Sequence, residues 1–182
     1  MKTLGLFRHA KSDWHDARAR DFDRPLNARG RLGAAVMGKH IADHGPRWQR
    51  ILASPAVRVA ETLELSARAA GTTTAPVIWD RRIYLASSAS LLDLLREQEG
   101  DPASILIVGH NPSLEDVIFD LVPDDGGSPL RDVVEVKFPT AAYAVLEIDI
   151  DSWADLEDGT ARLVHLTRPR DLDPDLGPEA FT

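Results

Sequence analysis

The sequence of 182 residues contains no cysteine. That absence excludes disulfide bonds, thiolate-ligated metal sites and a cysteine nucleophile. A long apolar run is missing near the start as well, because the stretch that precedes Arg8 is too short for the hydrophobic region of a signal peptide or for a membrane span. We therefore expect a cytoplasmic protein that has no membrane partner.

Positive charge is scarce in the last third of the chain. The formal net charge is −8, and residues 1–119 hold 16 Lys and Arg against 14 Asp and Glu, whereas residues 120–182 hold 5 against 15. Nucleic-acid binding needs a basic face that contacts phosphates, so we expect no nucleic-acid partner. The mildly basic N-terminal part suits a small anionic substrate.

Strand-like and helix-like segments alternate along the chain. The predicted strands are 3–7, 50–53, 75–79, 104–108, 133–138, 141–150 and 160–166, and the predicted helices are 27–43, 54–71, 90–98 and 112–121. Pro139-Thr140 separates two alternating segments, which indicates an antiparallel hairpin. This order predicts a three-layer α/β/α sandwich with a mostly parallel central sheet, formed by residues 1–168 as a single domain. Residues 169–182 are expected to be a loose acidic tail.

Local signals mark where two of the helices begin. Asn27 is a typical N-cap, and Ser54-Pro55 places a capping serine before a proline at the first helical position. We interpret Trp48, Trp79 and Trp153 as packing residues.

Three predicted strands are followed by polar side chains. Arg8-His9 follows the first strand, Ser54 and then Arg58 follow the second, and His110 follows the central one. Ligands of such sheets bind outside the carboxyl ends of the parallel strands. We therefore expect two histidines and two arginines to meet in one small volume.

This set of side chains is typical of phosphoryl transfer, although each member alone is a weak signal. Arginine binds phosphate oxygens in bidentate fashion and keeps its charge, and helix N-termini add N–H donors. One histidine can attack phosphorus, and a second can stabilise the developing charge. A metal site is disfavoured because no acidic ligands cluster nearby, and the chain has no Gly-rich lysine loop of the kind found in NTPases.

These motifs resemble those of the histidine phosphatase superfamily, and most closely those of the SixA-type phosphohistidine phosphatases. The resemblance extends over most of the chain, to about Trp153, and rests on the segments Leu6-Phe7-Arg8-His9-Ala10-Lys11-Ser12, Asp23-Arg24-Pro25-Leu26-Asn27-Ala28-Arg29-Gly30, Ser54-Pro55-Ala56-Val57-Arg58, Val108-Gly109-His110-Asn111-Pro112 and Pro139-Thr140-Ala141-Ala142.

The resemblance implies a phosphoglycerate-mutase-like fold and a reaction that passes through a phosphorylated His9. Arg8 and Arg58 would clamp the phosphate, His110 would bind it and stabilise the transition state, and water would hydrolyse the intermediate without a metal or organic cofactor. Lys11 and Ser12 follow the nucleophile and are further candidates for phosphate contacts.

A dedicated general acid is missing from the position where many members of the superfamily carry one. The corresponding segment, 80–87, offers only Asp80, which is best interpreted as a strand-end cap. An alkoxide leaving group needs a proton from an acid, whereas a protonated imidazole leaves as a neutral base. The expected substrate is therefore phosphohistidine in a protein of the histidine-phosphotransfer type, as used in signal transduction.

Other interpretations stay open at this point. The chain can be a small-molecule phosphomonoesterase of the same superfamily, or a phosphoprotein-binding module without catalysis. The loop that holds Asp21, Asp23 and Arg24 should overhang the site, and Trp14 and His15 are candidates for the substrate rim.

Overall fold

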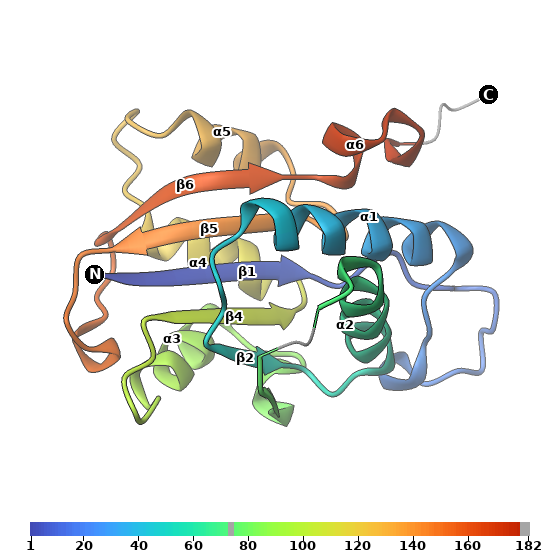
Figure 1. The fold of residues 1–182 in the computed structure, drawn as a ribbon, viewed down its shortest axis with the longest axis horizontal. Coiled ribbons are helices and arrows are strands. Elements are labelled where there is room, and N and C mark those ends of the chain that lie inside the picture. The colour runs from blue at the N-terminus through green and yellow to red at the C-terminus, as the bar shows by residue number, and fades with distance from the viewer. Residues whose placement is uncertain (73–74, 179–182) are drawn as a thin grey trace.

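A six-stranded mixed sheet forms the centre of the protein. The computed structural model describes residues 1–72 and 75–178. The strands lie in the order β3-β2-β4-β1-β5-β6 (Figure 1), and their bounds are β1 Lys2–Arg8, β2 Arg50–Ala53, β3 Val77–Trp79, β4 Ser104–Gly109, β5 Tyr143–Ile148 and β6 Ala161–Thr167. The first four strands in this order are parallel, whereas β5 runs antiparallel to both β1 and β6. The predicted fold class is therefore confirmed.

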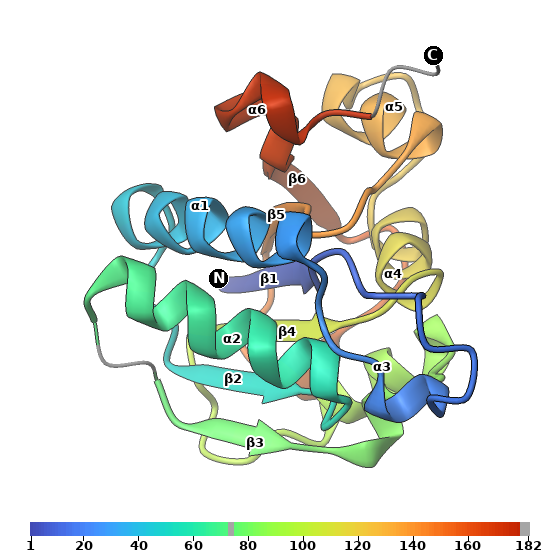
Figure 2. The same cartoon turned by 90° about the vertical axis from the view of Figure 1, so that its right-hand side faces the viewer.

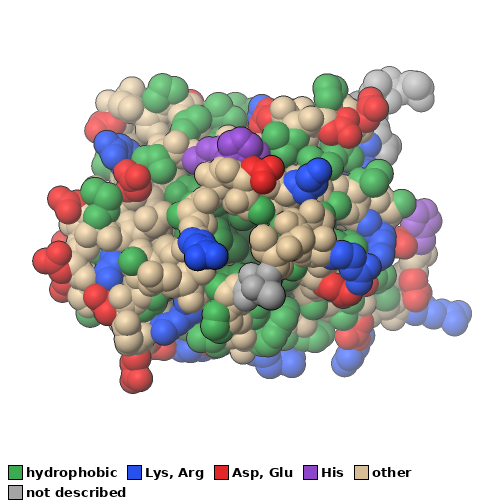
Figure 3. All heavy atoms as spheres, viewed as in Figure 1, with side chains coloured by type: hydrophobic (Ala, Val, Ile, Leu, Met, Phe, Trp, Pro, Cys, Tyr) green, Lys and Arg blue, Asp and Glu red, His purple; other side chains and the backbone are tan. Residues whose placement is uncertain are grey.

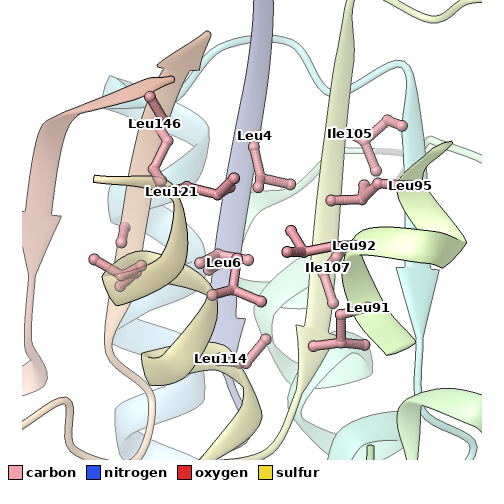
Figure 4. Packing of buried hydrophobic residues seen from close by; sticks show 14 of the residues in the cluster. Leu4, Leu6, Leu91, Leu92, Leu95, Ile105, Ile107, Leu114, Leu121 and Leu146 are labelled. Atoms are coloured by element: carbon pink, nitrogen blue, oxygen red, sulfur yellow. The ribbon is translucent and has the colours of Figure 1, made fainter. Parts of the chain in front are cut away.

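Helices cover both faces of the sheet. α1 (Ala28–His44) and α2 (Val57–Ala70) pack together on one face, and α3 (Ser88–Arg96), α4 (Ser113–Leu121) and α5 (Pro129–Val136) lie on the other (Figure 2). Because side chains alternate along a strand, each central strand contributes side chains to the cores on both faces of the sheet. In Figure 4, residues 4 and 6 of β1 and residues 105 and 107 of β4 point towards the leucines of α3 and α4. Residues 7, 106 and 108 belong to the core beneath α1 and α2.

One predicted strand is wrong: the segment 133–138 lies mostly in α5. Ser128 caps this helix by accepting a hydrogen bond from the Arg131 N–H, and Pro129 occupies its first turn. The buried residues of the helix, Arg131 and Val134, are three positions apart, which is helical spacing. Since α5 takes this segment out of the sheet, the predicted hairpin is wrong as well, and β5 pairs with β1 and β6 instead.

The predictions made from the sequence for the helix caps and for the tryptophans agree only in part with the structure. Asn27 caps α1 by accepting a hydrogen bond of 2.7 Å from the Gly30 N–H, as predicted. Ser54 is not the cap of α2, because that helix begins at Val57 after Ala56. Trp153 is buried, but Trp79 lies 48% exposed on the edge strand β3, so its interpretation as a packing residue is wrong.

The residues after β6 are folded against α1 as far as the structure describes them. The short helix α6 (Pro169–Leu172) begins with two reciprocal hydrogen bonds: the Arg168 N–H donates to the Asp171 carboxylate at 2.8 Å, and the Asp171 N–H donates to the Arg168 carbonyl at 2.9 Å. A 3-10 turn, Pro174–Leu176, follows, and Arg29 of α1 donates a hydrogen bond to the Gly177 carbonyl. Residues 179–182 of the expected tail lie outside the described residues.

Charged side chains of both signs are interspersed on the face shown in Figure 3. Within residues 1–72 and 75–178, no helix is both long and apolar enough to cross a membrane.

Candidate active site

The side chains predicted to meet at the carboxyl edge of the sheet do so. Figure 2 looks onto this edge, across which the segment between β1 and α1 runs. Arg8 pairs with Gly109 of the neighbouring strand, and the His9 N–H donates to the Gly109 carbonyl at 3.0 Å. The rings of His9 and His110 are consequently 5.2 Å apart between centroids. Both histidines, both arginines and the predicted Lys11 and Ser12 line one cavity of about 640 Å³, which we call the strand-end cavity.

His9 is held as a neutral imidazole with one free nitrogen. Its Nδ1 lies 2.7 Å from the Ala10 carbonyl oxygen, and because a carbonyl only accepts, Nδ1 carries the proton and Nε2 keeps its lone pair. Burial, followed by the nearby His110, Arg58 and Arg8, lowers the pKa of His9 to about 3. The ring is therefore in the form that a nucleophile requires.

His110 takes the opposite tautomer. Arg58 Nη2 donates to its Nδ1 at 3.2 Å, so the proton is on Nε2, which donates to Ser54 Oγ at 2.8 Å. Burial and then the charge of Arg58 lower the pKa of His110 to about 4. An anion bound beside Nδ1 favours a second proton on the ring, which then donates to that anion.

Ser54 is a candidate functional residue, although the sequence predicted it to be the cap of a helix. It is fully buried, and its hydroxyl fixes the orientation of the His110 ring. Its position directly after β2 is the same signal that identified His9 and His110.

The two predicted arginines present buried donors to the strand-end cavity. Arg8 Nη1 donates to the Phe138 carbonyl at 3.0 Å, and Arg58 Nη1 donates to the Asp21 carbonyl at 2.7 Å. The Nε atoms of both side chains are buried without a hydrogen-bond partner among the described residues. Because a guanidinium keeps its charge, these two side chains favour an anion in the strand-end cavity.

Asp21 supplies an internal anion at Arg58, one of these two arginines. Its carboxylate accepts from Arg58 Nη2 at 3.1 Å, from Tyr84 at 2.7 Å and from Arg24 Nη2. Burial opposes ionisation, but the hydrogen bond from Tyr84 and the charge of Arg58 outweigh it and lower the pKa of Asp21 to about 2. Tyr84 was not found from the sequence, where nothing distinguishes it from a packing residue.

The other loop candidates separate into two groups. Arg24 donates to Ser12 Oγ at 3.2 Å, and its guanidinium carbon lies 3.5 Å from the centre of the Trp14 ring. Arg24 and Trp14 both line the strand-end cavity. Asp23 pairs with Arg20 at 2.6 Å, and His15 pairs with Asp13 at the same distance; neither Asp23 nor His15 lines the cavity.

Among residues 1–72 and 75–178, no carboxylic acid is placed to donate a proton in the strand-end cavity. Asp21 is the one carboxylate among the described residues that line it, and it is ionised. Asp80 caps the turn that follows β3 by accepting from the Arg82 N–H at 2.8 Å, as predicted, and its carboxylate pairs with the Arg82 side chain. Over residues 1–72 and 75–178, no group of three or more His, Asp or Glu side chains is arranged to hold a metal ion.

The buried neutral histidines predict acid sensitivity. Their pKa values of about 3 and about 4 lie below the ordinary value of about 6.5, so the unfolded chain binds protons that the folded protein does not. The free energy of unfolding should therefore fall as the pH drops below about 6.5, by roughly 2 kcal/mol per histidine at about pH 5. Urea unfolding of the wild type, His9→Asn and His110→Asn at about pH 7.5 and about pH 5 measures this loss. An equal loss in all three proteins would contradict the assignment of His9 and His110 as neutral side chains in the folded protein.

Comparisons with a family profile, with a related sequence and with solved structures agree with one another. The sequence profile of the histidine phosphatase superfamily (branch 1) matches residues 4–83. An uncharacterised protein of Mycobacterium tuberculosis is 32% identical over 164 residues, which cover 90% of this chain and 99% of the relative. A crystal structure assigned to the phosphohistidine phosphatase SixA of Agrobacterium tumefaciens matches with a TM-score of 0.76 at 30% identity, over 92% of this chain and 98% of the other. A structure assigned to SixA of a Nakamurella species matches with a TM-score of 0.77 at 27% identity, over 92% and 96%.

Proposed function

The chain belongs to the histidine phosphatase superfamily, and we propose that it hydrolyses phosphohistidine in a protein substrate through a phosphorylated His9. The observation that carries the proposal is the combination of a neutral His9 with a free Nε2, two cationic arginines and an absence of any protonated carboxyl group among the described residues of the strand-end cavity.

In the first step, the Nε2 lone pair of His9 attacks phosphorus. The new P–N bond to His9 forms while the P–N bond to the substrate imidazole breaks, and the leaving nitrogen takes the electron pair. Arg8, Arg58 and a doubly protonated His110 stabilise the charge on the equatorial oxygens. In the second step, water attacks phosphorus, the electron pair of the P–N bond returns to His9 Nε2, a proton of the water passes to a phosphoryl oxygen, and inorganic phosphate leaves.

The lack of a protonated carboxyl group among the described residues that line the cavity favours this substrate class. An alkoxide leaving group is strongly basic and requires a proton in the transition state. An imidazole that is already protonated on its distal nitrogen leaves as a neutral base, whose conjugate acid has a pKa of about 6.5. Asp21 cannot take over the acid role while its pKa is about 2.

The rim of the cavity favours a substrate carried by a protein. Trp14 and Leu85 both line the strand-end cavity, yet they are 71% and 80% exposed. Large apolar side chains exposed next to a site are typical of surfaces that contact another macromolecule. A small phosphate ester would leave both side chains in water.

Brief incubation with a phosphohistidine peptide that has been separated from its phosphoramidate, followed by a quench without acid and intact-mass analysis, tests the intermediate without direct chemical phosphorylation of the six histidines. We expect one phosphoryl group on the wild type and none on His9→Ala, because alanine offers no nucleophile. His15→Ala, which removes an exposed histidine outside the cavity, is the matched control and should still be labelled.

Turnover of a phosphohistidine-containing phosphotransfer domain and of small phosphomonoesters tests the substrate class. We expect a higher kcat/KM on the domain. A clear preference for a phosphomonoester would assign the chain to small-molecule chemistry. Failure to label His9 with any donor would instead support a phosphoprotein-binding module.

A further inference from the structure

A second pocket lies beside the strand-end cavity, and its walls carry charge of one sign. This tail pocket is formed by the start of α1, the segment that follows His9 and the residues after β6, and its volume is about 120 Å³. Lys11, Arg29, Lys137 and Arg170 line it, whereas no Asp or Glu does within the described part of the chain.

The tail pocket adjoins the strand-end cavity. Lys11, Lys137, Pro139 and Thr140 line both. A protein substrate whose phosphoryl group lies at His9 therefore has the tail pocket next to the reacting group.

The concentration of cations in the tail pocket is unusual for this chain. The net charge is −8, and residues 120–182 have only 5 basic residues, of which Lys137 and Arg170 line this pocket. None of the four cations forms an ion pair with a carboxylate of the described residues, although many other arginines do. The face shown in Figure 3, by contrast, mixes both signs.

The wall that carries Arg170 is held in place by contacts with α1. Arg29 donates a hydrogen bond to the Gly177 carbonyl, and Pro169 lies over Gly33, where only 3.9 Å would separate its Cγ from an added Cβ. The reciprocal hydrogen bonds between Arg168 and Asp171 fix the start of α6. The cations are therefore presented by folded structure.

We propose that the tail pocket binds an acidic side chain that lies next to the phosphohistidine of the protein substrate, so that the enzyme prefers phosphohistidine with acidic neighbours. This inference rests on the proposed function. The pocket is large enough for a carboxylate and too small for a folded segment. Four cations that form no ion pair with a carboxylate of the described residues provide the complementary charge. The preference should weaken at high ionic strength, because the pocket is open to solvent.

Two synthetic peptides, phosphorylated on their one histidine with phosphoramidate, test the inference. One has Glu on both sides of the histidine, and the other has Gln at the same positions. We expect wild-type kcat/KM to be about tenfold higher on the Glu peptide, in line with one or two partly exposed charge pairs. Arg170→Glu should abolish this ratio while leaving kcat/KM on the Gln peptide within about twofold. Lys39→Glu, an equal charge change at an exposed position of α1 outside the pocket, is the matched control and should keep the ratio.

Binding of the unphosphorylated Glu and Gln peptides, measured by fluorescence anisotropy, gives a second readout that does not depend on turnover. Equal kcat/KM on both peptides, or an equal loss of the ratio in Lys39→Glu, would overturn the tail-pocket inference and leave the proposed function standing. Hydrolysis of neither peptide would overturn the proposed function, and the inference with it. Competition by free glutamate or diphosphate as strong as by the Glu peptide would assign the pocket to a small anion instead.

Discussion

Replacing Arg58 by lysine should lower kcat/KM for phosphohistidine by roughly a hundredfold to a thousandfold, the range observed when one oriented donor to a transition-state anion is lost. The guanidinium of Arg58 contacts three acceptors at once, namely the Asp21 carbonyl, the Asp21 carboxylate and His110 Nδ1. A lysine ammonium is a point charge that cannot reproduce this planar fork. The loss should appear in kcat, because the arginine acts on charge that develops in the transition state.

Arg24→Lys is the matched control for this experiment. Arg24 also pairs with Asp21, but its Nε is already occupied by Ser12 Oγ and its guanidinium stacks on Trp14. We expect a loss of less than about tenfold, which corresponds to weakened positioning of the loop. Equal losses in the two variants would show that Arg58 acts through the Asp21 loop and does not contact the transferred phosphoryl group.

Gly30→Ala should destabilise the protein by about 3 kcal/mol and also lower its activity. A Cβ at position 30 would lie 2.0 Å from the Lys11 carbonyl oxygen, so the backbone two residues after His9 would have to move. The neighbouring Ala10 carbonyl is the acceptor that sets the His9 tautomer. Strain introduced at this contact therefore reaches the nucleophile.

Gly33→Ala, one helical turn further along α1, separates this effect from helix propensity. An added Cβ at position 33 would meet no atom closer than 3.9 Å, so alanine should raise the free energy of unfolding by about 0.5–1 kcal/mol. Urea unfolding and kcat/KM of both variants check the pair. If Gly30→Ala unfolded like the wild type, the close contact would not be as tight as the structure indicates.

The layer arrangement was predictable from the sequence because the strongest signals are local. The run 105–108 is apolar at every position, and β4 is buried on both faces as a central parallel strand requires. The error at 133–138 has a physical cause: Val133-Val134-Glu135-Val136 fits a period of two as well as it fits a helix with one buried residue per turn. Ser128 and Pro129, which begin the helix, are the local signals that favour the helix.

Those residues of the candidate site that lie at the ends of strands were predictable from the sequence. Arg8, His9 and His110 follow strands that the sequence defines, and the parallel arrangement brings them together. Asp21 and Tyr84 meet only through folding of two separate loops, and no periodicity reports such a contact. Lys137 could not be placed, because the error in α5 assigned it to a strand.

The position of β1 between β4 and β5 also determines when the site can exist during synthesis. The strand that presents His9 leaves the ribosome first, but its two hydrogen-bonding neighbours begin at Ser104 and Tyr143. Contacts of such large sequence separation form late and slowly. A nascent or truncated chain that ends before Ile148 would lack part of the β5 edge of β1 and hence the complete support for His9. Unfinished chains should therefore not remove phosphoryl groups, and the activity should arise only when nearly the whole domain has been made.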